Sequence, residues 1–157
     1  MKAIIVCTSV SHGNTKRIAD VIGQVLEARV VAPGEVDAAE LATYDLVGFG
    51  SGIFNMAFHP ELRDFVKSLP EGQRGKAFVF ASSGFPEPKF RQYTRTLSKS
   101  IEQKGFSVVD VFTCRGFDTW LPLKIVGGIR KGHPDANDLD AARTFAVGLR
   151  SRIGAPS

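Results

Sequence analysis

The chain contains little cysteine, tryptophan or tyrosine. Its 157 residues include two cysteines, one tryptophan and two tyrosines, whereas phenylalanine occurs twelve times. The two cysteines, Cys7 and Cys114, are far apart in the sequence, and each lies in or at the end of an apolar run. This usage excludes a disulfide-rich scaffold. We expect two buried thiols in a protein of the cytoplasm, with phenylalanine filling the core.

Long apolar runs are also absent. No stretch approaches the roughly 20 apolar residues that a membrane-spanning helix needs, and the first residues do not have the layout of a signal peptide. We therefore expect no membrane association. The three histidines, His12, His59 and His133, lack the spacing of metal ligands, so we expect no metal site.

Charge is distributed unevenly along the chain, which carries a formal net charge of +4. Residues 1–73 contain six basic and nine acidic side chains, whereas residues 74–157 contain fourteen basic and seven acidic ones. The basic half could attract an anionic partner, but charges scattered over solvated helix faces are the commoner explanation. No zinc finger or RNA-stacking motif is present, so we expect no nucleic-acid binding.

Apolar runs typical of strands alternate with amphipathic runs typical of helices. The predicted strands are residues 2–7, 28–32, 45–51, 76–82 and 106–114. The predicted helices are residues 17–26, 37–44, 60–69, 89–104 and 136–153. This alternation predicts an α/β fold, a doubly wound three-layer sandwich with a five-stranded parallel sheet in the order 2-1-3-4-5. We expect one domain over residues 1–157.

Such a sheet binds its ligand outside the carboxyl ends of its strands. The loops that follow the first, third and fourth predicted strands are TSVSHGNT (8–15), GSGIFNMAFHP (50–60) and SSGFPEPK (82–89). All three are rich in glycine, serine or threonine. Loops of this kind allow a ligand to approach the main chain closely.

The first of these loops lacks the residues of several phosphate motifs. It has neither the glycine and lysine of a P-loop nor a G-x-G-x-x-G fingerprint. Gly13 stands where a cysteine phosphatase loop beginning at Cys7 would need arginine, and the acidic residues of a receiver domain are missing. What remains is a loop of neutral hydrogen-bond donors before a helix, a combination that favours the binding of an anion. An ordinary polar turn capped by Asn14 or Ser11 is the alternative.

The stretch IIVCTSVSHGNTKRIADVI resembles the phosphate loop of the flavodoxin family, in which an apolar strand leads to a hydroxyl-rich loop ending in G-N-T. The interval from Ser9 to Gly13 is one residue longer than in the commonest flavodoxin form, and Cys7 stands in place of the usual aromatic residue. The two other loops, in the same order along the chain, extend the resemblance over most of the sequence.

The resemblance implies a flavodoxin-like domain that binds FMN. The residues implied to hold its phosphate are Ser9, Ser11, His12, Gly13, Asn14 and Thr15. Those implied to contact one side of the isoalloxazine are Ser51, Gly52, Ile53, Phe54 and Asn55, with Ser82, Ser83, Gly84 and Phe85 on the other. In flavodoxins a peptide of the third-strand loop changes its hydrogen bonding as the flavin is protonated, and Gly50 and Gly52 would give that loop the necessary mobility. No catalytic side chain is implied, because the flavin supplies the redox chemistry.

Several individual residues have two interpretations. Phe54, Phe58 and Phe85 either contact the flavin or anchor their loops in the core. His12 either binds the phosphate or faces solvent, whereas His59 is expected to begin a helix. Residues 115–138 are long for a connecting loop. They form either a structural flap along the sheet edge or a cover for the flavin that can dock a partner through Arg130 and Lys131.

The leading functional hypothesis is an electron carrier that shuttles electrons between redox partner proteins. The alternative is an FMN-dependent reductase that transfers electrons from NAD(P)H to a quinone-like acceptor, so whether the chain is an enzyme stays open. A third hypothesis is a domain that kept the fold without redox activity. The absence of a large insertion favours the carrier. Carrier flavodoxins are usually acidic, and this basic chain would instead select an acidic partner.

Overall fold

Five parallel strands form the centre of the molecule in a computed structural model that describes residues 1–9, 14–54, 57–82, 92–114 and 136–154. They are β1 (Ala3–Thr8), β2 (Arg29–Val31), β3 (Leu46–Phe54), β5 (Lys76–Ser82) and β6 (Ser107–Cys114). Their order in the sheet is β2-β1-β3-β5-β6, and a short strand, β4 (Ala57–Phe58), pairs antiparallel with β3. This order confirms the predicted doubly wound α/β fold.

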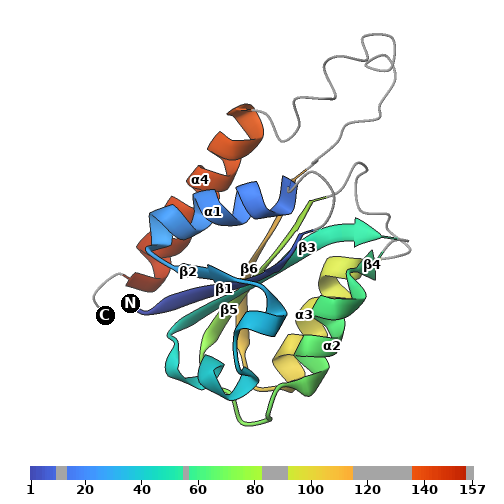
Figure 1. Cartoon of the computed structure of the whole chain (residues 1–157). Helices are drawn as coiled ribbons and strands as arrows, with labels where there is room; N and C mark the ends of the chain where they lie inside the picture. The colour runs from blue at the N-terminus through green and yellow to red at the C-terminus, as the bar shows by residue number, and fades with distance from the viewer. Residues whose placement is uncertain (10–13, 55–56, 83–91, 115–135, 155–157) are drawn as a thin grey trace.

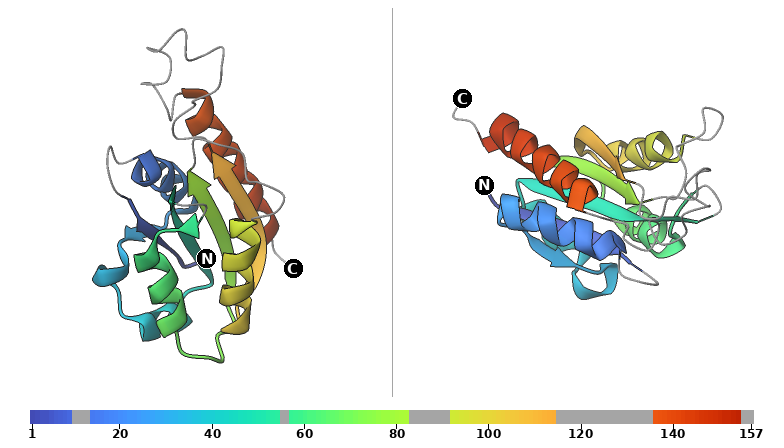
Figure 2. Two further views of the ribbon diagram at one scale, coloured as in Figure 1. Left: turned by 90° about the vertical axis from the view of Figure 1, so that its right-hand side faces the viewer. Right: turned by 90° about the horizontal axis from the view of Figure 1, so that it is seen from above.

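Two helical layers cover the sheet (Figures 1 and 2). Helices α1 (Asn14–Leu26) and α4 (Ala136–Gly154) lie on one face, and α2 (Pro60–Ser68) and α3 (Tyr93–Gln103) lie on the other. Two 3₁₀ helices, η1 (Pro33–Glu35) and η2 (Ala38–Thr43), connect β2 to β3. Among the described residues, no helix combines the length and the apolar character needed to span a membrane.

Strand β1 shows how the sequence builds two cores. All six of its residues are buried, because the parallel sheet is covered on both faces. Successive side chains point to opposite faces of a strand. Ile4 and Val6 therefore join the core beneath α2 and α3, whereas Ile5 and Cys7 join the core beneath α1 and α4.

The contact between β3 and β5 depends on two glycines. Gly48 pairs with Phe78 and Gly50 pairs with Phe80 in the parallel register. A Cβ atom on either glycine would overlap the phenyl ring of its partner. The two rings stack on each other with their centroids 6.1 Å apart. Gly50 thus provides space for a core aromatic ring inside a strand, and the expectation that it gives mobility to a loop is wrong.

Three predicted elements differ from the structure. Strand β3 continues to Phe54, three residues beyond the predicted end, because Ile53 and Phe54 pair with Phe58 and Ala57 of β4. The segment predicted as an α-helix over 37–44 is the 3₁₀ helix η2, in which the Asp37 side chain accepts the N–H of Ala39 at 3.1 Å. Within the described residues the helix predicted over 89–104 begins only at Tyr93.

The start of α2 confirms two interpretations of single residues. His59 is the N-cap of α2, and its Nδ1 atom accepts the N–H of Glu61 at 3.0 Å. Phe58 is 2% exposed and packs edge-on against Tyr93, with the ring centroids 6.0 Å apart. His59 therefore begins the helix as predicted, and Phe58 anchors its segment in the core.

The glycine–phenylalanine pairing predicts the effect of adding a methyl group. Gly50→Ala should lower the free energy of unfolding by about 1–3 kcal/mol, since the Phe80 ring must move within a packed core. Gly148→Ala is the matched control, because no atom of the described residues lies within 4 Å of a Cβ at this position in α4. The control should raise stability by up to about 1 kcal/mol. Urea unfolding measures both changes, and a Gly50→Ala protein as stable as the wild type would contradict the packing described.

Candidate functional site

The ends of three strands form a row at the carboxyl edge of the sheet. Thr8 of β1 pairs with Ser51 of β3, and Gly52 of β3 pairs with Ser82 of β5. Thr8, Ser51 and Ser82 are all buried, at 6%, 0% and 7% exposure. The structure thus brings the predicted residues Ser51, Gly52 and Ser82 together at one edge. Three neighbouring strands carry hydroxyl side chains and main-chain groups there.

Helix α1 begins at the same edge (Figure 1). Its first turn contains no acidic residue, so no side chain of that turn compensates the positive end of the helix dipole. Thr15, in this turn, is 4% exposed. The N–H of Lys16 donates to Ser9 Oγ at 3.3 Å, while the Lys16 ammonium group pairs with Asp20 at 3.2 Å. The main-chain N–H groups of a helix start, together with neutral hydroxyls, suit the binding of an anion.

Thr8 contains a buried hydroxyl group without a partner. Its Oγ1 atom is fully enclosed and has no hydrogen bond to any described residue. An unsatisfied buried hydroxyl costs about 1–3 kcal/mol, so this atom is suited to a polar ligand at the edge. The sequence placed Thr8 first in the hydroxyl-rich loop over 8–15, but Thr8 was not included among the residues implied to bind the phosphate. Its position as the first hydroxyl after the apolar run was the available signal.

Ser51 differs from Thr8 because its hydroxyl is already engaged. Ser51 Oγ donates to the carbonyl of Gly52 at 2.7 Å and accepts the N–H of His59 at 3.0 Å. The bond from His59 joins β3 to the residue that begins α2. The predicted site residue Ser51 therefore stabilises the edge, and the neighbouring Gly52 and Ile53, both half-buried, present the accessible part of β3.

The remaining predicted site residues divide into two groups. Asn14 begins α1 and Phe54 ends β3, so the main chain of both lies at this edge. Outside the described residues lie Ser11, His12, Gly13, Asn55, Ser83, Gly84 and Phe85. Most of the predicted flap over 115–138 also lies outside them, since only 136–138 are described, within α4. The alternatives for His12, Phe54, Phe85 and the flap stay predictions.

Cys7 does not add a nucleophile to this edge. It is 6% exposed and packs into the core beneath α1 and α4. Burial, with a smaller contribution from Asp20, raises the pKa of the Cys7 thiol from its ordinary value of 9.0 to about 12. The thiol is therefore protonated at neutral pH, which argues against cysteine-based phosphate chemistry. Within the described ranges no group of three or more His, Cys, Asp or Glu side chains could hold a metal ion.

Solved structures with the same architecture include flavodoxins. A flavodoxin from the domain Archaea matches with a TM-score of 0.70 at 20% identity, over 99% of this chain and 100% of that chain. Oxidised Flavodoxin 2 from Bacillus cereus also matches with a TM-score of 0.70 at 20% identity, over 97% of this chain and 99% of that chain. At this level of identity the likeness demonstrates the fold alone.

Sequence comparison identifies the family. An uncharacterized protein of Methanocaldococcus jannaschii is 35% identical over 149 residues, which cover 95% of this chain and 98% of the relative. The family profile of the flavodoxin domain matches residues 5–116, most of the chain. The chain therefore belongs to the flavodoxin domain family.

Proposed function

We propose that the chain binds FMN at the carboxyl edge of its sheet and carries electrons between redox partner proteins. Two observations at this edge support the proposal best: the first turn of α1 has no acidic residue, and the buried Thr8 hydroxyl has no hydrogen bond to any described residue. This donor set matches a phosphate monoester, because helix N–H groups and hydroxyls all donate to phosphate oxygens.

The same donors hold a phosphate without activating it. The Lys16 ammonium group is paired with Asp20, and the Cys7 thiol is protonated. Neither a charged clamp nor a nucleophile therefore faces the phosphate from these residues. The phosphate group acts as an anchor, held by Thr15, Thr8, Ser9 and the main chain of α1, together with the proposed contacts of Ser11, His12, Gly13 and Asn14.

The flavin ring would lie between the loops that follow β3 and β5. Gly52 and Ile53 are near the end of β3, and Gly52 pairs with Ser82 at the end of β5. The proposed lining consists of these residues together with Phe54, Asn55, Ser83, Gly84 and Phe85. Main-chain groups of the loops can donate to the polar rim of the ring, while Ile53 offers an apolar contact. A bound flavin supplies the redox chemistry, so these residues position it and control its access to water.

The charge of the chain bears on the choice of partner. A formal net charge of +4 favours association with acidic redox proteins, since opposite net charges accelerate encounter. The alternative function, an FMN-dependent reductase for a quinone-like acceptor, needs a site for a reducing nucleotide as well as one for the acceptor.

Replacement of Thr8 tests the binding of FMN. Thr8→Val removes the hydroxyl and retains the shape, so FMN affinity should fall about tenfold while the stability of the FMN-free protein stays equal or rises by up to about 1 kcal/mol. Titration with FMN and urea unfolding measure the two effects. Thr43→Val is the control, because Thr43 is exposed and precedes β3 at the opposite edge. A Thr8→Val protein that is less stable and binds FMN normally would assign the hydroxyl a structural role.

Turnover with a small acceptor distinguishes the carrier from the reductase. The FMN-loaded protein, mixed with NADPH and a benzoquinone, should oxidise NADPH no faster than free FMN at the same concentration. The physical reason is that a carrier positions only its flavin and provides no site for the nucleotide. Absorbance at the NADPH band measures the rate. Saturable oxidation at well above the rate with free FMN would establish the reductase instead.

A further inference from the structure

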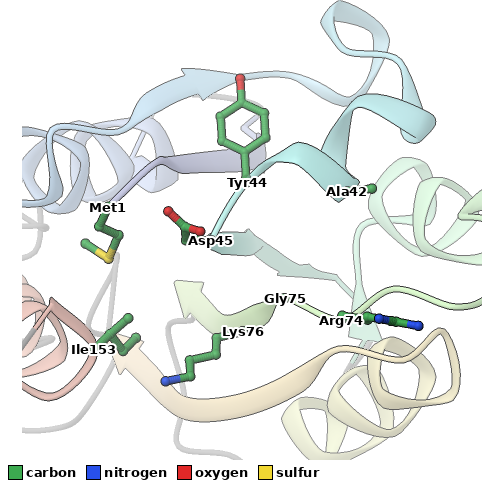
Figure 3. Close-up of a pocket in the computed structure, with 8 residues that line it drawn as sticks. All are labelled: Met1, Ala42, Tyr44, Asp45, Arg74, Gly75, Lys76 and Ile153. Carbon is green, nitrogen blue, oxygen red and sulfur yellow. The ribbon is translucent and has the colours of Figure 1, made fainter. Parts of the chain in front are cut away.

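A groove lies at the amino-terminal edge of the sheet, where β1, β3 and β5 begin (Figure 3). Its volume is about 560 Å³, and its walls come from four parts of the chain: the start of β1, the segment from η2 to β3, the start of β5 and the end of α4. This volume is within the range of ligand-binding clefts, which is roughly 300–1,000 Å³. No residue of the candidate flavin site contributes to it.

The groove and the carboxyl edge lie at opposite ends of the same strands. From Leu46 to Ser51, β3 runs from the groove toward the row of hydroxyls. At ~3.3 Å per residue, the five steps from Leu46 to Ser51 separate the two edges by roughly 17 Å. An occupant of the groove therefore leaves the carboxyl edge accessible.

Positive charge predominates among the groove's side chains. Arg74 and Lys76 are exposed, and neither forms an ion pair with any described residue. The one acidic lining side chain, Asp45, accepts the N–H of Lys2 at 2.7 Å. The Lys2 ammonium group lies 4.6 Å from the centroid of the Tyr44 ring, which adds a third cation beside the groove. This arrangement attracts carboxylates.

The shape of the groove favours a polypeptide over an enclosed small molecule. Figure 3 shows Asp45 and Lys76 on opposite sides, with Ile153 toward one end and Arg74 toward the other. The half-buried Ile153 supplies apolar surface at its end of the groove. An elongated open groove with apolar surface and separated cations fits an extended segment with alternating acidic residues.

We propose that this groove docks an acidic, extended segment of a partner protein through Arg74 and Lys76. The segment's carboxylates pair with the two cations, and an apolar side chain of the segment lies against Ile153. Because the groove is remote from the carboxyl edge, this partner stays bound while a redox protein occupies the other end of the sheet. The site is a tether that does not depend on a bound flavin.

Fluorescence anisotropy tests the proposal with a labelled peptide of alternating glutamate and glycine and a matched glutamine peptide. The full chain at low ionic strength should bind the glutamate peptide saturably and the glutamine peptide weakly. In the double variant Arg74→Gln/Lys76→Gln the affinity should fall about tenfold, the effect of losing two exposed ion pairs. Saturation with FMN should leave the affinity within about twofold, since the edges are separate.

The double variant Arg95→Gln/Lys99→Gln is the matched control, because it removes the same charge from the exposed face of α3. Its affinity for the glutamate peptide should change less than about twofold. Equal losses of peptide affinity in the two double variants would mean that only the net charge of the protein matters, and would overturn the proposal. An absence of saturable binding of the glutamate peptide would also overturn the proposal. So would a labelled single-stranded oligonucleotide that binds more tightly than the glutamate peptide and depends on Arg74 and Lys76.

Discussion

The pairing of two phenylalanines with two glycines determines how the central strands meet. Phe78 lies across Gly48, and Phe80 lies across Gly50, on the face covered by α1 and α4. A shift of one residue in the pairing of β5 with β3 would turn both rings toward the opposite face of the sheet, where the core is already filled. The register is therefore fixed at the middle of the sheet. Because β3 also pairs with β1, the same constraint aligns the ends of three strands, on which the candidate site depends.

The carboxyl edge that results has no reactive nucleophile among its described residues. It combines a helix start without acidic residues, hydroxyls at strand ends and a protonated thiol beneath them. Two of these hydroxyls have distinct roles. The Ser51 hydroxyl joins β3 to the start of α2, whereas the Thr8 hydroxyl has no hydrogen bond to any described residue and can bind a ligand. Such an edge can hold a phosphorylated cofactor by hydrogen bonds alone. The positively charged groove at the other end of the strands provides the contrast, because its cations lack partners among the described residues.

Sequence reasoning predicted the fold well because hydrophobic periodicity directly reports which faces are buried. It placed β5 over residues 76–82 and predicted the strand order. It failed where the outcome depends on strand pairing and on contacts between segments, which periodicity does not report. The glycine in Ser51-Gly52-Ile53 indicated the end of a strand, but pairing with β4 extends β3 to Phe54. The role of Gly50 required knowledge of Phe80 across the sheet, and the groove required residues from four segments.

The central claim is that the carboxyl edge holds a flavin by its phosphate. Calorimetric titration of the wild-type protein with FMN and with riboflavin, which differ only in that phosphate, tests it most directly. The account predicts one FMN per chain and an affinity at least about tenfold above that for riboflavin, because charge-assisted hydrogen bonds to the phosphate are lost in riboflavin. Equal affinities for the two flavins, or no binding of FMN, would contradict it.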